Sequence, residues 1–292
     1  MILVANAPVT FGVFEMTEGR EDLPDAGDVL DAVSSGGYDG IDLGPPGYLG
    51  GPGGLSAALR SRKLALAGGY APLHLTEADA LHDDMAMLDG ILDLLQKGGD
   101  SRLPPRPTLA DAGAPHRKSR VDAGASLDES GWRMLIDGLE RAVARCRERG
   151  LAPVFHHHIG TWVQTPAEID LLLETSDVGL CLDSGHLLLA GGNPIEAVGR
   201  WGERIEQVHV KDARLEVLRS AKSMEEVWAG GAFCPLGEGD VDVAGFVDRV
   251  GGSGYSGWVV VEQDRVLAPG ESVAAIAKEQ ASNRRVLHSL GW

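Results

Sequence analysis

Residues able to bind a metal ion occur where four predicted strands end in the second half of the chain. Side chains alternate along a strand, so His156 and His158 share one face of the run at residues 152–157 and just beyond it. The same alternation brings Asp183 to the end of the next run, with His186 three residues later in the turn. Each late strand therefore delivers one candidate ligand at a similar height, and the set is His156, Asp183, His209 and Glu262.

Two imidazoles and two carboxylates form a mixed nitrogen and oxygen shell. Such a shell suits one Mn²⁺ or Co²⁺ ion and leaves open positions for substrate oxygens, while Mg²⁺ and Zn²⁺ are further candidates. A lone histidine at a strand end is usually structural. Four histidines at one rim favour a functional site over four separate structural roles, and these are His156, His158, His186 and His209.

Three further residues are candidates for binding a substrate at the same rim. Lys211 could hold a hydroxyl or carbonyl oxygen, or it could form a structural ion pair with Asp212 or Glu262. Asn6 and Asp42 follow the first and second predicted strands and could also reach the rim. Both residue types are common in such turns because they form local hydrogen bonds, which is the alternative explanation.

The remaining histidines and the cysteines are expected to be structural or inert. His157 faces the opposite side of its strand and should pack between the strand and the helices, while four histidines have no comparable context, namely His74, His82, His116 and His288. The cysteines are odd in number and widely spaced without a CxxC pair, so we expect reduced thiols at Cys146, Cys181 and Cys234.

Short β-type runs alternate with longer amphipathic stretches throughout the chain, which is typical of βα units around a parallel sheet. Eight units predict an α/β fold, a (β/α)₈ TIM barrel that forms a single domain over residues 1–292. The predicted strands are 2–5, 40–43, 64–67, 106–109, 152–157, 178–182, 205–210 and 258–262. Clear helical patterns occur at 77–96, 127–149, 166–174 and 273–290.

Two long loops follow predicted strands and would therefore lie on the face that carries the active site in such barrels. The loop at 44–54 is rich in Gly and Pro, and it is either a lid or a flexible connection. The loop at 213–240 contains a predicted helical piece at 220–228 and is a second candidate lid.

Composition excludes several classes of function. No apolar run approaches the roughly 18 to 20 residues that span a bilayer, and residues 1–13 lack the pattern of a secretory signal, so we expect no membrane partner and a cytoplasmic location. The net charge of −17 without a long basic run disfavours nucleic acid as a partner. A small polyhydroxylated carbonyl compound is the expected substrate, and homo-oligomerisation is left open.

Five segments of the chain resemble the xylose isomerase-like TIM barrel superfamily, in particular its inosose dehydratase branch. These segments are HHHIGT at 156–161, CLDSGH at 181–186, VHVKD at 208–212, PLGEGDVD at 235–242 and GWVVVEQD at 257–264. The resemblance covers nearly the whole chain. It implies that Asp183, His209 and Glu262 bind the metal, that His186 contacts substrate and that His158 takes part in proton transfer.

One departure from the family pattern bears on the reaction. Epimerases of this superfamily usually carry a glutamate where this chain has His156, and that glutamate serves as a ligand and as one of two bases. Epimerisation needs a proton acceptor on each face of the substrate carbon, whereas elimination of water needs one base and one acid. The sequence therefore favours a metal-dependent dehydratase, with Glu262 or His158 as the base and a protonated His158 or His186 as the acid.

Other functions are kept open by the sequence. A ketose isomerase or epimerase could take its second base from a lid residue such as Glu238. Subunits resembling this superfamily also occur in complexes that cleave C-glycosides. A barrel that binds a sugar or a metal without turnover is a third alternative, because fold resemblance alone does not establish function.

Overall fold

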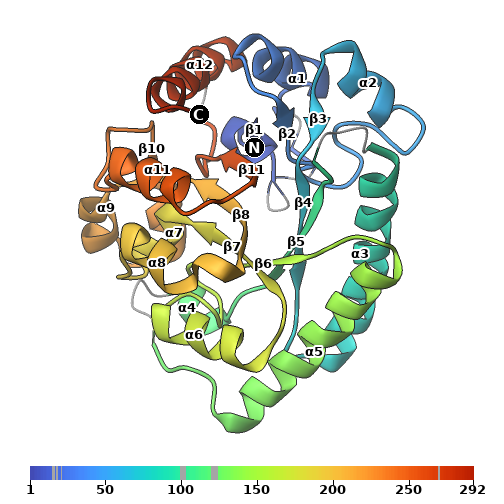
Figure 1. The fold of residues 1–292 in the computed structure, drawn as a ribbon, viewed down its shortest axis with the longest axis vertical. Coiled ribbons are helices and arrows are strands. Elements are labelled where there is room, and N and C mark those ends of the chain that lie inside the picture. Colours follow the sequence, from blue (N-terminus) through green and yellow to red (C-terminus); the bar gives the residue numbers. More distant parts are fainter. Residues whose placement is uncertain (15–16, 18, 21, 99–102, 120–123, 269) are drawn as a thin grey trace.

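Nine parallel strands form one sheet that curves into a nearly closed barrel, with helices around its outside (Figure 1). The computed structural model describes residues 1–14, 17, 19–20, 22–98, 103–119, 124–268 and 270–292. Around the barrel the strands follow the order β3-β2-β1-β11-β8-β7-β6-β5-β4. Their bounds are β1 Ile2–Asn6, β2 Gly40–Ile41, β3 Ala65–Leu66, β4 Gly68–Leu73, β5 Arg106–Asp111, β6 Val154–His156, β7 Gly179–Asp183, β8 Ile205–Val210 and β11 Gly257–Val261.

The barrel closes through a single bent strand. β3 and β4 lie at opposite ends of the strand order but are separated in the chain only by Ala67. The N–H of Ala67 donates to the carbonyl of Ile41 on one side, and its carbonyl accepts from the N–H of Arg106 on the other. The two pieces therefore act as one unit of the barrel, and the prediction of a (β/α)₈ architecture is confirmed.

The third predicted strand, 64–67, was wrong in extent because the pairing continues through β4 to Leu73. Gly68, Gly69 and Pro72 are unfavourable strand residues, and they conceal this segment from a pattern search. Packing explains the first glycine, since a Cβ on Gly68 would lie 2.8 Å from the carbonyl oxygen of Arg106. The second predicted strand, 40–43, is also shorter in the structure and ends at Ile41.

The helices cover the outside of the barrel and bury an apolar face against it (Figure 1). Helices α3 and α5 pack side by side, and Leu92 and Leu139 are among their fully buried residues. The predicted helices at 77–96, 127–149, 166–174 and 273–290 correspond to α3, α5, α6 and α12. The helices are α1 Ala26–Ser35, α2 Leu55–Ser61, α3 Ala78–Gly98, α4 Pro115–Lys118, α5 Glu129–Glu148, α6 Pro166–Thr175, α7 Ser184–Leu189, α8 Pro194–Trp201, α9 Leu215–Ser220, α10 Met224–Ala229, α11 Val243–Gly252 and α12 Val273–Ser289.

The segment at 213–240 folds into two short helices and a small hairpin rather than one helical piece. The predicted helical piece at 220–228 corresponds to α10 but starts too early. Helix α9 ends at Ser220, and α10 begins after Ser223, whose side chain accepts from the N–H of Glu226 and caps the new helix. Strands β9 (Asp212–Ala213) and β10 (Phe233–Cys234) then pair antiparallel across the excursion.

The loop at 44–54 is anchored to the body of the protein. The Tyr48 hydroxyl donates to the carbonyl of Pro24, and Leu49 is buried in the main hydrophobic core. Gly44 adopts a φ of 62°, where a Cβ would also lie 2.7 Å from the Pro8 ring. A purely flexible connection does not fit these contacts, and a lid function for this loop stays a prediction.

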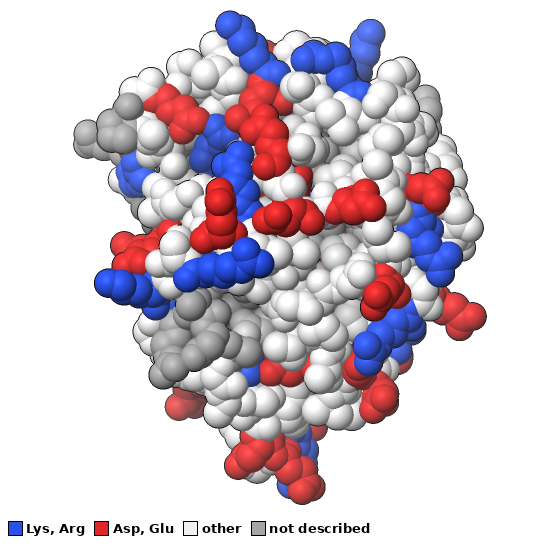
Figure 2. Space-filling model, turned by 90° about the vertical axis from the view of Figure 1, so that its left-hand side faces the viewer, with Lys and Arg blue, Asp and Glu red and all other residues white. Residues whose placement is uncertain are grey.

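Acidic and basic side chains alternate over the face shown in Figure 2, where Lys and Arg lie beside Asp and Glu. Ion pairs of the protein include Arg200 with Asp170 and Arg214 with Glu238. In the described parts of the chain, no helix combines the length and apolar character needed to cross a membrane.

A buried ion pair holds the loop that follows His158. The guanidinium of Arg117 on α4 donates to both carboxylate oxygens of Glu168 on α6, with the shorter contact at 2.7 Å, and also to the carbonyl of Thr161. Burial alone would raise the pKa of Glu168, but the Arg117 guanidinium and the backbone N–H groups of Thr165 and Gln164 hold it below its usual value.

Glu168→Gln should lower the free energy of unfolding by about 3 kcal/mol at pH 7, because it leaves the buried charge of Arg117 unpaired. A lowered folded-state pKa stabilises the fold above the pKa of the unfolded carboxyl, and this stabilisation is lost as pH falls through the folded value. Chemical denaturation at pH 7 and at lower pH should therefore show the gap between the two proteins closing on acidification.

Glu129→Gln is the matched control, since Glu129 forms an exposed ion pair with Arg133 on one helix. That change should cost no more than about 0.5 kcal/mol. Equal stability of the Glu168→Gln variant and the unmodified protein at pH 7 would contradict a stabilising role for the buried pair.

Candidate functional site

Four buried side chains meet at the carboxyl ends of four neighbouring strands. Their possible ligand atoms all lie within 4.8 Å of one another, and every member is buried. β6, β7 and β8 each supply one residue, and the fourth directly follows β11. The structure thus brings together the predicted set of His156, Asp183, His209 and Glu262.

Strand register explains why these residues meet. Asp183 pairs with His209 across β7 and β8, and His209 pairs in turn with Val260 on β11. His156 pairs with Cys181, two residues before Asp183 on the same face of β7. Because the strands are parallel, their carboxyl ends reach the same rim, where inward-facing residues form layers.

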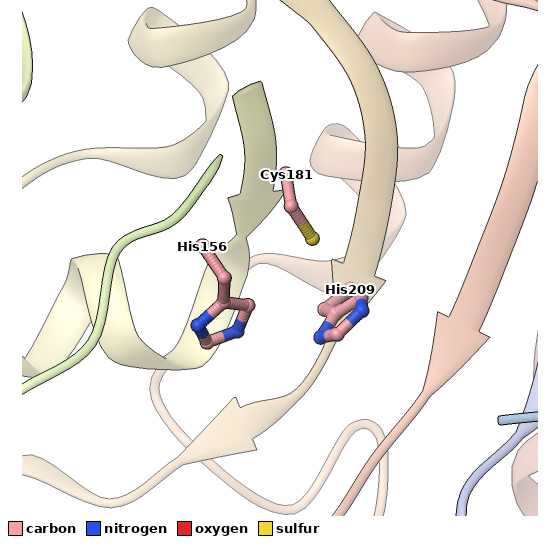
Figure 3. Close-up of side chains that lie close together, drawn as sticks. All are labelled: His156, Cys181 and His209. Atoms are coloured by element: carbon pink, nitrogen blue, oxygen red, sulfur yellow. The ribbon is translucent and has the colours of Figure 1, made fainter. Parts of the chain in front are cut away.

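Cys181 lies at the floor of this cluster. Figure 3 shows its sulfur directed toward the space between the rings of His156 and His209, and the three possible ligand atoms lie within 4.8 Å of one another. Burial raises the pKa of the Cys181 thiol to about 11, so the sulfur is protonated near neutral pH. All three cysteines are buried free thiols, and burial also raises the pKa values of Cys146 and Cys234 to about 12.

Asp183 serves the fold and the site with different oxygen atoms. Its Oδ1 accepts from the backbone N–H of His186 at 2.9 Å and caps α7, while Oδ2 lies 3.3 Å from the Nε2 atom of His156. The Asp183 N–H donates to Nε2 of His157, which is buried behind the strand as expected. Burial opposes ionisation, but Lys211 holds the pKa of Asp183 well below its usual value.

The donor set fits a divalent cation. Nδ1 of His156 and Nε2 of His209 are buried without a hydrogen-bond partner among the described residues, while Nδ1 of His209 lies 3.0 Å from Oε2 of Glu262. Leaving such nitrogens unsatisfied is costly, and each neutral imidazole has one nitrogen whose lone pair a bound cation would accept. Burial lowers the pKa of His156 to about 3, which keeps this ring in the neutral form that ligates metals. Burial also disfavours the charged form of His209, but Cys181 and Glu262 outweigh it and raise the pKa of His209 well above its usual value, so a metal ion would displace a proton from that ring.

Lys211 is the main cation of the site and is almost fully buried. Its Nζ lies 3.0 Å from Oε2 of Glu262 and 3.3 Å from Oδ2 of Asp183. Burial lowers the pKa of Lys211, but three surrounding carboxylates outweigh this effect and raise it well above its usual value. The predicted pair with Glu262 is therefore present, together with a further pair that the sequence did not suggest, at 2.7 Å from Oδ1 of Asp264.

Asp212 is not a partner of Lys211, which corrects the alternative raised from the sequence. Its carboxylate accepts from the backbone N–H groups of Gly237, Gly239 and Val241 and thereby folds the turn at 235–241. A Cβ on Gly239 would lie 2.3 Å from that carboxylate, so the glycine is required. The PLGEGDVD segment is therefore explained by the turn that it forms around the Asp212 carboxylate.

A second cluster adjoins the first and consists of His158, His186 and Asp264, whose possible ligand atoms also lie within 4.8 Å of one another. The two imidazole ring centroids are 3.8 Å apart, and Nε2 of His186 is 3.3 Å from Oδ2 of Asp264. Sequence reasoning missed Asp264. It follows Glu262 by two residues, so the strand alternation that singled out Glu262 could also have found it.

His158 and His186 are both neutral at ordinary pH, since burial lowers the pKa of each ring. Nδ1 of His158 lies 2.7 Å from the carbonyl oxygen of Ile159. A carbonyl only accepts hydrogen bonds, so this nitrogen carries the ring proton and Nε2 keeps its lone pair. Nε2 of His186 lies 2.9 Å from the ammonium of Lys211 and acts as the acceptor of that contact.

Asn6 and Asp42 have other contacts. The Asn6 amide donates to Oε1 of Gln280 on α12 and accepts from the N–H of Ala7. The Asp42 carboxylate accepts from the N–H of Leu43 and would lie 3.0 Å from a Cβ placed on Gly68. The structure does not bring either residue into the two clusters, and substrate contacts for them stay predictions.

The other four histidines also lie outside the two clusters. His74 pairs with Asp84, and the ring of His116 packs at 4.9 Å from that of Trp162. His82 and His288 are exposed. These contacts agree with the expectation that none of the four belongs to the site.

The excursion at 213–240 covers the second cluster with two aromatic rings. Trp228 on α10 stacks on His158 with ring centroids 6.0 Å apart, and Phe233 on β10 meets His186 edge-on at 5.0 Å. Both rings also line a surface cleft of about 510 Å³ that reaches Asp264. This segment therefore has the position of a lid, with Asp264 between the cleft and the buried residues.

Comparison with known proteins agrees with this architecture. A profile of the xylose isomerase-like TIM barrel family matches residues 30–283. An inosose dehydratase of Geobacillus kaustophilus strain HTA426 is 29% identical, with 97% of this chain and 96% of the relative covered.

Solved structures share the fold at lower identity. The probable 3-DHS dehydratase AsbF of Bacillus anthracis superposes with a TM-score of 0.72 at 13% identity, covering 98% of each chain. The IOLI protein, solved with a bound zinc atom, gives a TM-score of 0.70 at 16% identity, covering 98% of this chain and 96% of that protein. The chain is an enzyme that belongs to the xylose isomerase-like TIM barrel family.

Proposed function

We propose that this enzyme is a divalent-metal-dependent dehydratase that removes water from a keto-polyol such as a keto-inositol. The observation that carries the proposal is the juxtaposition of a buried four-residue donor set with a neutral imidazole, His158, whose Nε2 is free of the ring proton. The inosose dehydratase of Geobacillus kaustophilus, aligned over nearly the whole of both chains, supports the substrate class.

His156, Asp183, His209 and Glu262 are the residues that would hold the ion. Their mixed nitrogen and oxygen donors favour Mn²⁺ or Co²⁺ over softer metals. When bound, such an ion polarises a ketone oxygen and so acidifies the adjacent carbon. The sulfur of Cys181 is directed toward the space between the rings of His156 and His209, next to the four-residue set.

His158 is the base in this proposal. Its Nδ1–H is held by the carbonyl of Ile159, so Nε2 takes the proton from the carbon next to the ketone. Glu262 is a weaker candidate, because His209 and Lys211 overcome the effect of burial and lower its pKa to about 2. An anion stabilised to that degree has little tendency to accept a proton.

The same imidazole completes the elimination. Once protonated, His158 returns its proton to the β-hydroxyl, the carbon–oxygen bond breaks and water leaves, while the carbon–hydrogen electron pair becomes the new double bond. The product is an α,β-unsaturated ketone. One proton is taken and one is returned, so a single imidazole that acts first as base and then as acid balances the reaction. The ring of His186 packs beside that of His158, with the two centroids 3.8 Å apart.

His209→Gln should weaken Mn²⁺ binding by more than about 100-fold, since changes even outside the ligand shell commonly cost 10–100-fold. Isothermal titration calorimetry of the metal-stripped protein measures the effect directly. His74→Gln is the control, because His74 pairs with Asp84 outside the cluster and its loss should leave affinity unchanged. Equal affinity of the His209→Gln variant and the unmodified protein would remove His209 from the site.

His158→Gln should reduce turnover of a keto-inositol by about 1,000-fold while Mn²⁺ affinity stays within a few-fold of the unmodified protein, because general base catalysis contributes 10²–10⁴-fold. The ultraviolet absorbance of the unsaturated ketone follows turnover. Loss of metal binding in this variant would instead assign His158 to the ligand shell. A product that keeps its water and has one inverted centre would overturn dehydration in favour of epimerisation.

A further inference from the structure

The ammonium of Lys211 touches the same oxygen atoms that face the candidate metal ligands. Oδ2 of Asp183 lies 3.3 Å from Nζ and 3.3 Å from Nε2 of His156. Oε2 of Glu262 lies 3.0 Å from Nζ and 3.0 Å from Nδ1 of His209. A divalent cation bound by these oxygens would therefore compete with the ammonium for its two partners.

Asp264 offers the ammonium a separate position. Of the three carboxylate contacts made by the Lys211 ammonium, the shortest is to Oδ1 of Asp264, at 2.7 Å. Asp264 lies outside the four-residue donor set. Nε2 of His186 accepts from the same ammonium at 2.9 Å. In the structure the ammonium contacts Asp264 and His186 at the same time as Asp183 and Glu262. The place beside Asp264 and His186 alone is called the second cation position.

The backbone of Lys211 is held in place by the side chain of Ser184. Its N–H donates to Oγ of Ser184, and that hydroxyl donates back to the carbonyl of Lys211. The ring of Phe233 lies 5.3 Å from Nζ and closes the site on the lid side. A shift of the ammonium away from Asp183 and Glu262 toward Asp264 would therefore need only a rotation of the side chain.

We propose that Asp264 is a positioning residue that draws the Lys211 ammonium into the second cation position and so leaves Asp183 and Glu262 to a divalent metal ion. This inference rests on the proposed metal site. Formal charge also supports binding of a divalent cation. The three carboxylates outnumber the single ammonium, so these four side chains together are negatively charged and attract a second cation.

Asp264→Asn should weaken Mn²⁺ binding to the metal-stripped enzyme by about tenfold, because the ammonium then keeps its hold on Asp183 and Glu262. Lys211→Met in the Asp264→Asn background should restore the lost affinity, since the competing cation is gone. Couplings of this size are usual between contacting charged residues, and a double-mutant cycle isolates them. Isothermal titration calorimetry gives the four affinities without reference to turnover.

The cycle separates a positioning role from a simple loss of negative charge. If Asp264 acts only as a distant charge, Asp264→Asn will weaken binding equally in the Lys211→Met background, and the proposal is overturned. It is also overturned if Asp264→Asn alone binds Mn²⁺ within twofold of the unmodified enzyme. Should Lys211→Met not fold alone, Lys211→Gln replaces it in both arms of the cycle.

Two controls make the result specific. Glu271→Gln removes the same charge in the same cleft, but Glu271 pairs with Arg265, so Mn²⁺ affinity should change less than twofold. Asp264→Glu keeps the charge and should bind close to the unmodified enzyme. Failure of the unmodified enzyme to bind any divalent ion would overturn the proposed metal site itself, an outcome distinct from binding that ignores Asp264.

Discussion

Two carboxylates buried at the rim of the barrel, Asp183 and Glu262, constrain the rest of the site. Charges withdrawn from water are stable only when they are paired and hydrogen-bonded. Asp183 meets this demand by capping α7 with one oxygen and facing Lys211 with the other. The barrel therefore needs cationic partners at this point, and the same need makes the position suitable for a divalent ion.

The segment at 213–240 and the second cluster close one side of the site. Trp228 and Phe233 cover His158 and His186, and exclusion of water by such rings strengthens electrostatic interactions beneath them. Asp264 lies where the surface cleft meets these buried groups. His158 is the one imidazole base on this side, and His156 stands where related epimerases usually carry a glutamate as second base. The arrangement therefore supports elimination of water better than inversion at carbon.

Much of the site could be predicted because strand alternation depends only on neighbouring residues. That rule selected the four members of the first cluster and His158 of the second, and it extends naturally to Asp264. His186 was placed instead by its position in the turn three residues after Asp183. Contacts between distant segments could not be predicted. The hydrogen bond between Asn6 and Gln280 joins residues 274 positions apart. Whether Lys211 pairs with Asp212 or Glu262 depends on a turn whose backbone N–H groups engage Asp212. In the fold, Gly68 and Pro72 hid β4, since close packing rather than local preference makes that segment a strand.

Metal content measured together with metal-dependent turnover tests the central claim most directly. The purified enzyme is analysed by mass spectrometry for bound metal, stripped with a chelator and assayed for formation of the unsaturated ketone from a keto-inositol before and after Mn²⁺ or Co²⁺ is restored. We expect one divalent ion per chain, loss of turnover on stripping and recovery on restoration. A protein that carries no metal and dehydrates the substrate equally well in the presence of chelator would contradict the claim.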